Sequence, residues 1–211
     1  MLMTRRTIGW LAATLLSFAA LGAHAQAKAP EALIKEVSTD VLDAVKADKT
    51  IQAGDIRKVI ALVDQKVLPY VNFQRMTASA VGRYWRQATP EQQKRLQEEF
   101  KLLLVRTYSG ALSQVSAEQT VELKPMRSSP TDTEVVVRTE IKGKGDPIQL
   151  DYRLEKAGDS WKIYDVNVLG VWLVENYRNS FAQEIGANGI DGLIAKMAER
   201  NKSAAAAGAK S

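Results

Sequence analysis

The chain has 211 residues, of which 29 are lysine or arginine and 24 are acidic, and it contains no cysteine. Its single histidine, His24, lies in a segment that we expect to be removed on export. The remaining chain has neither histidine nor cysteine. It therefore cannot carry out Ser-His-Asp or Cys-His catalysis, form disulfides, or hold a zinc ion through imidazole or thiolate ligands. The net charge of +5 is mild and no long basic run accompanies it, so we expect no nucleic-acid partner.

The N-terminus, residues 1–25, has the pattern of a cleaved signal peptide. Arg5 and Arg6 give it a positive start, an apolar run extends from Ile8 to Leu21, and Ala23-His24-Ala25 fits a small-x-small cleavage site. The apolar run is shorter than the roughly 18 to 20 residues that span a bilayer as a helix, which disfavours an uncleaved membrane anchor. The paired arginines also permit twin-arginine export, and the sequence leaves that choice open.

Helical periodicity begins directly after this segment. A first helix is indicated by apolar residues at four-residue spacing, namely Leu33, Val37, Val41 and Val45. A second apolar stripe runs from Ile56 to Val67, with Asp55 as a suitable N-cap and Pro69 as its end. One or two short helices, broken near Gly82, are expected between Asn72 and Trp85.

The clearest helix start in the sequence is Thr89-Pro90-Glu91-Gln92. Thr89 can cap the helix, Pro90 suits its first position, and Gln92 completes a capping box. We expect this helix to run to about Val115. It is apolar on more than one side, so it must be covered on more than one side.

From Thr120 the pattern changes to that of β-strands. Strands are predicted at residues 121–123, 134–141, 148–154 and 161–168. In the third of these, apolar and polar residues alternate strictly, which is typical of a strand with one wet face. Short turns at Gly143–Gly145 and Ala157–Ser160 indicate an antiparallel meander.

After Gly170 the helical period returns, breaks at residues 186–189, and resumes in a short helix from Ile190 to Arg200. The Ala-rich tail, residues 203–211, has nothing to bury and is expected to be disordered. The order of elements predicts an α+β fold in one domain, residues 26–202, with a helical N-terminal part. A curved, four-stranded antiparallel sheet would pack one face on the long helix and can leave a cone-shaped cavity there.

Carboxylate chemistry is the first candidate for catalysis, and the spacing of the acids does not support it. Asp151 and Glu155 alternate with apolar residues, so we expect them on the solvated face of the sheet. Asp165 lies among apolar residues, where a structural hydrogen bond is its expected role. No pair of acids has the spacing of a glycosidase or a metal site.

Two other features leave alternatives open. The basic and aromatic cluster can bind a phosphate-bearing headgroup or an acidic partner, or it can be aromatic packing flanked by snorkelling arginines. It consists of Arg75, Arg83, Tyr84, Trp85 and Arg86. The nearly continuous apolar run from Val166 to Val174 is either core or the wall of a ligand cavity that opens to the surface.

Two blocks of residues, which together cover nearly all of the expected mature chain, form a recognisable pattern. The first block is Val71–Met76, Gly82–Gln92, Phe100 and Leu103–Tyr108. The second block is Asp165-Val166, Gly170-Val171, Asn176–Arg178, Phe181 and Gly189–Leu193. With these two blocks the chain resembles the MlaC family, also called the toluene-tolerance auxiliary transport family.

The resemblance implies a soluble periplasmic phospholipid carrier that is not an enzyme and has no catalytic residues, metal or cofactor. Its implied fold is an NTF2-like cone of sheet and helices, which holds the acyl chains and leaves the headgroup near solvent. Its implied partners are an outer-membrane lipoprotein–porin complex and an inner-membrane ABC transporter complex with an MCE-domain subunit. The implied task is to maintain the lipid asymmetry of the outer membrane.

From period and position we expect a lipid-tail pocket and a headgroup mouth. The pocket is expected to be lined by Phe100, Leu104, Tyr108, Tyr152, Val166, Val168, Val171, Trp172, Tyr177 and Phe181. The mouth is expected to carry Arg83, Arg86 and Arg106. The alternative from another class is a protein-interaction adaptor of the same fold, with a filled core and no ligand.

Overall fold

The computed structural model describes residues 28–129 and 131–208, so the expected signal peptide lies outside the described residues. Its N-terminal part is helical, as predicted. It consists of α1 (Pro30–Ala47), α2 (Lys49–Gln52), α3 (Ile56–Leu62), a π-helical turn (Val63–Val67) and a 3₁₀ turn (Leu68–Tyr70). Asp55 caps α3 as expected, since its side chain accepts hydrogen bonds from the backbone N–H groups of Arg57 and Lys58.

The middle of the chain contains α4 (Phe73–Val81), a 3₁₀ turn (Gly82–Gln87), α5 (Pro90–Tyr108) and a second 3₁₀ turn (Ser109–Gln114). The predicted capping box of α5 is confirmed. The Gln92 N–H donates to the Thr89 hydroxyl at 3.2 Å, and the Thr89 N–H donates to the Gln92 side chain at 3.0 Å. The α-helical part ends at Tyr108 rather than near Val115, because the last turn tightens to 3₁₀ geometry.

Replacing Thr89 by alanine removes this cap and is expected to lower the free energy of unfolding by about 1 kcal/mol, because the first turn of α5 loses a partner for its N–H groups. Urea denaturation of the two proteins measures the difference. Thr120→Ala, at an exposed position outside the helices, is the control and should stay within about 0.5 kcal/mol of the unsubstituted protein. Equal losses in both variants would contradict the capping role.

The strands form one antiparallel sheet in sequence order, as the meander predicts, but there are five of them instead of four. They are β1 (Thr120–Leu123), β2 (Glu134–Lys142), β3 (Ile148–Ala157), β4 (Ser160–Val168) and β5 (Val171–Trp172). We expected helical structure after Gly170. Leu169 and Gly170 instead adopt positive φ values of 51° and 90°, which turns the chain back in a tight hairpin before the helix begins.

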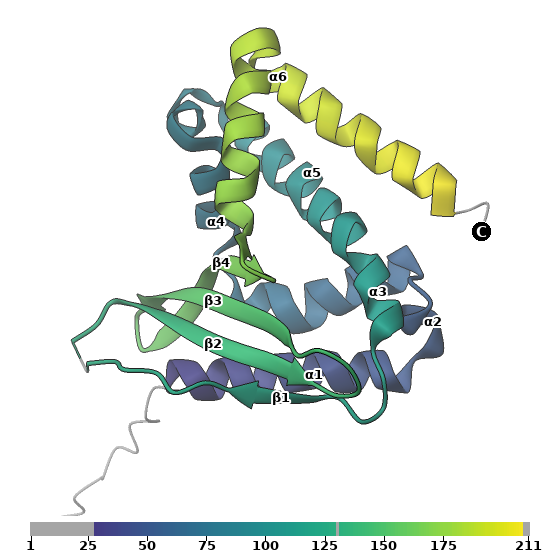
Figure 1. The fold of residues 1–211 in the computed structure, drawn as a ribbon. Coiled ribbons are helices and arrows are strands. Elements are labelled where there is room, and N and C mark those ends of the chain that lie inside the picture. The colour runs from purple at the N-terminus through teal and green to yellow at the C-terminus, as the bar shows by residue number, and fades with distance from the viewer. Residues whose placement is uncertain (1–27, 130, 209–211) are drawn as a thin grey trace, which may run out of the picture.

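The last helix, α6 (Leu173–Gly208), has two halves that meet at Gly189, where φ is 73°. The second half runs back along α5 (Figure 1). The expectation of a disordered tail is wrong for residues 203–208, which continue this helix. Alanine has the highest helix propensity, so a helix that is already anchored can extend through an Ala-rich segment without burying it.

The helices do not cover the sheet in the way that we expected. α1 lies across one face of the sheet, whereas α5 packs on α3, α4 and α6 (Figure 1). The expected packing of the sheet on the long helix is therefore wrong, because the buried apolar side chains of α5 pack on other helices. We call the face under α1 the inner face and the opposite one the outer face.

The buried apolar residues form three separate clusters instead of one. The first joins α4, α5 and α6, the second joins α1 to the inner face, and the third joins α1, α2 and α3 to the C-terminal end of α5. The half-buried Val71 and Val166 pack against both the first and the second cluster. A domain of this size usually has one contiguous core, whereas here the buried apolar residues are divided among three clusters.

Candidate functional site

The inner face of the sheet is fully covered at one end and partly open at the other. Under α1, Val137 and Leu154 are 0% exposed. Further along the same face lie Tyr152, Val166 and Val168, which are only half-buried. Tyr152 is directly opposite Val137 and Val166 in the strand register, so these residues share the face.

Burial falls in the same way along one side of α5. Phe100, Leu104 and Tyr108 are four residues apart and therefore lie on one side of the helix. Phe100 is 0% exposed, whereas Leu104 and Tyr108 are half-buried. Desolvation by burial, with the nearby Tyr177, raises the pKa of Tyr108 above its ordinary value. The part of this helix that carries Leu104 and Tyr108 is thus neither fully covered nor fully exposed.

Tyr152 is a half-buried residue deep within the fold. Its hydroxyl lies 3.2 Å from the hydroxyl of Ser38 on α1, and desolvation by burial raises its pKa. Tyr152 and Thr139, which is directly opposite Leu150, therefore give the inner face two polar groups among aliphatic residues.

Three of the six aromatic residues that we expected in the pocket wall belong to the packed core. The Phe100 ring lies 5.1 Å from that of Tyr177 and 5.3 Å from that of Phe181, both in edge-to-face geometry. All three are buried in the first cluster. The structure therefore splits the expected wall into a packed aromatic group and a partly open group. The open group is Leu104, Tyr108, Tyr152, Val166 and Val168.

The two expected wall residues of β5 point to opposite faces of the sheet. Val171 is opposite Val168 and so belongs to the inner face, where it is 47% exposed. Trp172 is opposite Asn167, which places it on the outer face. There the guanidinium of Arg153 stacks 3.9 Å from the centre of the Trp172 ring. Trp172 is therefore separated from the other wall residues by the sheet itself.

The expected mouth residues do not form one cluster. Arg83 and Arg86 lie in the 3₁₀ turn before α5, whereas Arg106 lies near the end of that helix, about 24 Å further along its axis at 1.5 Å per residue. Arg106 is also only two residues from Tyr108 and so points to a nearly opposite side. Its Nε is buried and has no hydrogen-bond partner among the residues that the structure describes. One lipid headgroup cannot contact all three arginines.

The other members of the basic and aromatic cluster take part in packing. The side chain of Arg75 pairs with Glu134 and Glu155, and its guanidinium lies 3.7 Å from the centre of the Tyr164 ring. Its charge is therefore balanced within the protein. Tyr84 and Trp85 pack against the first core cluster. Of the two alternatives that the sequence left open for this cluster, aromatic packing describes Arg75, Tyr84 and Trp85. Arg83 and Arg86 remain exposed beside them.

The environments expected for the acidic residues of the sheet are only partly those found in the structure. Asp165 has the expected structural role, since it accepts hydrogen bonds from the N–H groups of Val166 and Val174 at 2.9 and 3.1 Å. The expectation that Asp151 is solvated is wrong, because it is only 6% exposed. Alternation assigns a side chain to a face, but it does not show how far its neighbours enclose it. Glu155 is half-buried and pairs with Arg75.

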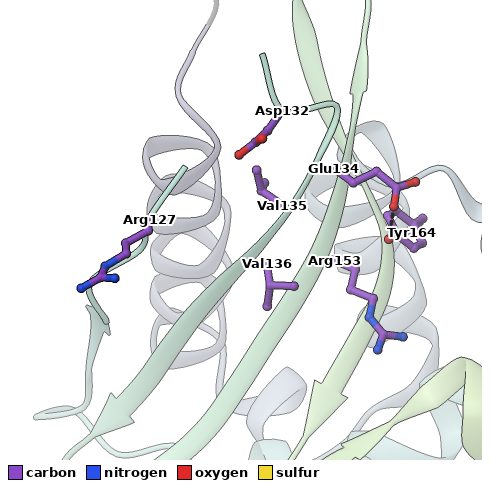
Figure 2. A pocket seen from close by; sticks show the side chains of 7 residues that line it. All are labelled: Arg127, Asp132, Glu134, Val135, Val136, Arg153 and Tyr164. Atoms are coloured by element: carbon purple, nitrogen blue, oxygen red, sulfur yellow. Dashed lines mark hydrogen bonds between the residues drawn. The ribbon is translucent and has the colours of Figure 1, made fainter. Parts of the chain in front are cut away.

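Two hollows at the surface of the described residues are not wide apolar chambers. Figure 2 shows the larger one, of about 250 Å³, where Glu134, Arg153 and Tyr164 approach one another. The Tyr164 hydroxyl donates to Glu134 there, at 3.1 Å. The smaller hollow, of about 60 Å³, lies between α5 and α6 and includes Tyr177 and Phe181 in its lining.

Within residues 28–129 and 131–208, no group of three or more potential metal ligands gathers.

Sequence reasoning missed three residues of the open part of the inner face. Ile141, Ile148 and Leu150 are half-buried, and Leu150 is directly opposite Val168. The alternation of β3, which was visible in the sequence, assigns Ile148 and Leu150 to the same face as Tyr152. The signal for including them was therefore present.

Together these features define an α+β protein in which the helices leave part of an apolar sheet face uncovered. No helix in the part of the chain that the structure describes is long and apolar enough to cross a membrane.

The MlaC protein family model matches residues 35–199, and the chain belongs to this family. It is 27% identical to the toluene tolerance protein ttg2D of Pseudomonas putida over 185 residues, 84% of this chain and 86% of that protein. It is 25% identical to the intermembrane phospholipid transport system binding protein MlaC of Haemophilus influenzae over 172 residues, 80% of each chain.

A solved structure supports the same fold. The phospholipid-binding protein of Ralstonia solanacearum, determined in complex with a phospholipid, matches with a TM-score of 0.79 and 47% sequence identity. The match covers 83% of this chain and 98% of that one. The expected α+β fold is therefore confirmed, with one more strand than the sequence indicated.

Proposed function

We propose that this protein is a periplasmic phospholipid carrier that holds acyl chains between the open part of the inner sheet face and α5, in an NTF2-like cone. The observation that carries the proposal is the set of apolar residues on the inner face and on one side of α5 that stay only half-buried at the edges of the packed clusters. The phospholipid in the Ralstonia solanacearum protein, which is 47% identical, supports this ligand class.

The proposed wall follows from burial. Leu104 and Tyr108 form the helix side, and Tyr152, Val166 and Val168 form the sheet side. Phe100, Tyr177 and Phe181 support this wall from behind, since they are buried in the adjoining cluster. Val171 marks the end of the wall that is open to solvent, where we place the headgroup.

The energetics of the ligand require partners that exchange lipid directly. Two acyl chains carry about 30 methylenes, and at about 0.8 kcal/mol each their burial is worth roughly 24 kcal/mol. This exceeds the limit of about 18 to 21 kcal/mol that non-covalent affinities reach, so release into water is negligible. Exchange with another apolar site changes the free energy little, and direction must then come from an energy-consuming partner.

We therefore propose that the protein is exported by its signal peptide and shuttles lipid between two membranes. The partners would be an outer-membrane lipoprotein–porin complex and an inner-membrane ABC transporter complex with an MCE-domain subunit. Such shuttling would maintain the lipid asymmetry of the outer membrane. The protein would perform no catalysis and would need no cofactor besides its phospholipid ligand.

Native mass spectrometry of the protein purified without detergent tests the proposal. We expect one bound phospholipid per chain in the unsubstituted protein. Val168→Trp fills the proposed site from the sheet side and should abolish most of this occupancy, whereas Val136→Trp, on the outer face of β2, should leave it unchanged.

Two results would contradict the proposal. Absence of phospholipid from the gently purified protein would favour the adaptor with a filled core. Equal occupancy in the two tryptophan variants would place the lipid elsewhere. Circular dichroism of both variants shows that the comparison is made between folded proteins.

A further inference from the structure

The turn between β4 and β5 contains a residue in an unfavourable conformation. Leu169 has a φ of 51° and is the single non-glycine residue with positive φ in the described part of the chain. With Gly170 at 90°, it forms a two-residue hairpin loop in which both positions are left-handed. Asparagine, aspartate and glycine suit such positions, whereas the Cβ of leucine is strained there.

The same residue is also unfavourably exposed. Leu169 is 66% exposed, and Val171 is 47% exposed. Leu123, on β1, is the third exposed large hydrophobic residue of residues 28–129 and 131–208. Leucine at position 169 is thus unfavourable in two respects, because its backbone is strained and its apolar side chain is exposed to water. Strained residues of this kind gather where a protein binds something.

The conformation of the turn is held from both sides. The Leu169 N–H donates to the carbonyl oxygen of Gln149 at 3.2 Å, and the Gly170 N–H donates to Oδ1 of Asn167 at 2.8 Å. Asn167 is itself buried. These bonds fix the turn whatever side chain position 169 carries, so the turn is preorganised rather than loose.

The turn continues the proposed lipid site. Val168 is directly opposite Leu150 on one side and Val171 on the other, so the three residues form one row across the inner face. Leu169 follows Val168 where that row reaches solvent. Two aliphatic side chains alone bury far less than the about 1,200 to 2,000 Å² of a protein interface, and their continuity with the apolar row of the inner face favours an acyl chain as the occupant.

We propose that Leu169 and Val171 form the outer lip of the phospholipid site, where they contact the acyl methylenes nearest the glycerol. This inference rests on the proposed carrier function and adds the position at which the chains leave the protein. Because the lip is preorganised, it covers these methylenes without ordering a loop on binding, and it slows the escape of the lipid.

The substitution Leu169→Asn separates the two consequences of the strained residue. Asparagine tolerates positive φ, so the melting temperature should rise by about 2 to 4 °C. It cannot replace the apolar contact, so transfer of a preloaded pyrene-labelled phosphatidylethanolamine to excess phosphatidylcholine vesicles should become about fivefold to tenfold faster. Leu169→Met, which keeps an apolar side chain, should transfer at the rate of the unsubstituted protein.

Leu123→Asn is the matched control, since it removes an exposed leucine from the opposite edge of the sheet. We expect it to leave the transfer rate unchanged. If Leu169→Asn binds phospholipid and transfers it at the original rate, the lip is absent. If Leu169→Asn transfers phospholipid to protein-free vesicles at the original rate but no longer exchanges it with membranes that contain the partner complexes, the turn contacts a protein. That result would equally overturn the proposal. A lowered melting temperature in Leu169→Asn would contradict the strain on which the inference depends.

These outcomes are distinct from a failure of the carrier function. In that case the unsubstituted protein itself would take up no labelled phospholipid, and no transfer rate would exist to compare.

Discussion

Replacing Phe100 by alanine is expected to lower the free energy of unfolding by about 3 to 5 kcal/mol, the range found when a buried phenylalanine is truncated. The ring is 0% exposed and touches Tyr177 and Phe181 edge to face, with Phe73 at 5.9 Å. Its loss opens a cavity at the junction of α4, α5 and α6, which cannot close without moving three helices. Denaturant titration followed by tryptophan fluorescence measures the effect.

Tyr108→Ala provides the comparison, because Tyr108 lies two turns further along the same side of α5 and is only half-buried. We expect a loss of about 1 to 2 kcal/mol there, since less contact is removed. In contrast, Tyr108→Ala should weaken phospholipid binding more than Phe100→Ala does in the folded protein. If both substitutions destabilise equally, the division of this side of α5 into core and open wall is wrong.

Replacing Asp165 by alanine is the second large loss, and we expect about 2 to 4 kcal/mol. Its carboxylate accepts the N–H groups of Val166 and Val174 and a bond from Arg153 at 3.0 Å, and it is 1% exposed. Removing it leaves one backbone donor unsatisfied in β4, at Val166, and one at the start of α6, at Val174. Arg153 contributes less, since it is partly exposed and also pairs with Glu175. Calorimetric unfolding measures the loss.

The same residue gives stability a pH dependence of known sign. Desolvation by burial raises the pKa of Asp165 above its ordinary value of 3.8, although the N–H donors and Arg153 oppose this shift. The folded protein therefore binds this proton more tightly than the unfolded chain. Its contribution is fully present below pH 3.8 and is lost as the pH rises through the raised pKa.

Asp165→Asn removes this titration, so the stability of the unsubstituted protein relative to the variant should fall as the pH rises above 3.8. A relative stability that increases with pH in this range would mean that the hydrogen bonds, and not burial, dominate the pKa of Asp165.

The local features of this fold could be predicted because each depends on a few neighbouring residues. The Thr89 capping box and the Asp55 cap follow from side chains that reach their own backbone. The order of β2, β3 and β4 follows from alternation and short turns. The existence of β5 could not be predicted, since it depends on Leu169 adopting a conformation that leucine disfavours.

The candidate site could be predicted only in part, because periodicity assigns a residue to a face but not to a partner. Tyr152, Val166 and Val168 were placed on the correct face, while Trp172 was assigned to it by the apolar character of its neighbours. Phe100 shares its side of α5 with Leu104. Only the three-dimensional packing shows that the first is enclosed and the second is not.

The mouth illustrates the same limit of one-dimensional reasoning. Arg83 and Arg106 are both basic and both flank apolar segments, and sequence alone gives no distance between them. The length of α5 separates them. A rule that restricts a headgroup site to residues at one end of a helix would have kept Arg83 and Arg106 out of the same site.

The most direct test of the carrier proposal is a crystal structure with a phospholipid whose acyl chains carry bromine. Anomalous scattering locates the bromine atoms without reference to the protein model. We predict that they lie between the inner face at Tyr152 and Val166 and the side of α5 that carries Leu104 and Tyr108. Bromine found only in the polar hollow at Arg153 and Tyr164, or no bound bromine at all, would contradict the account.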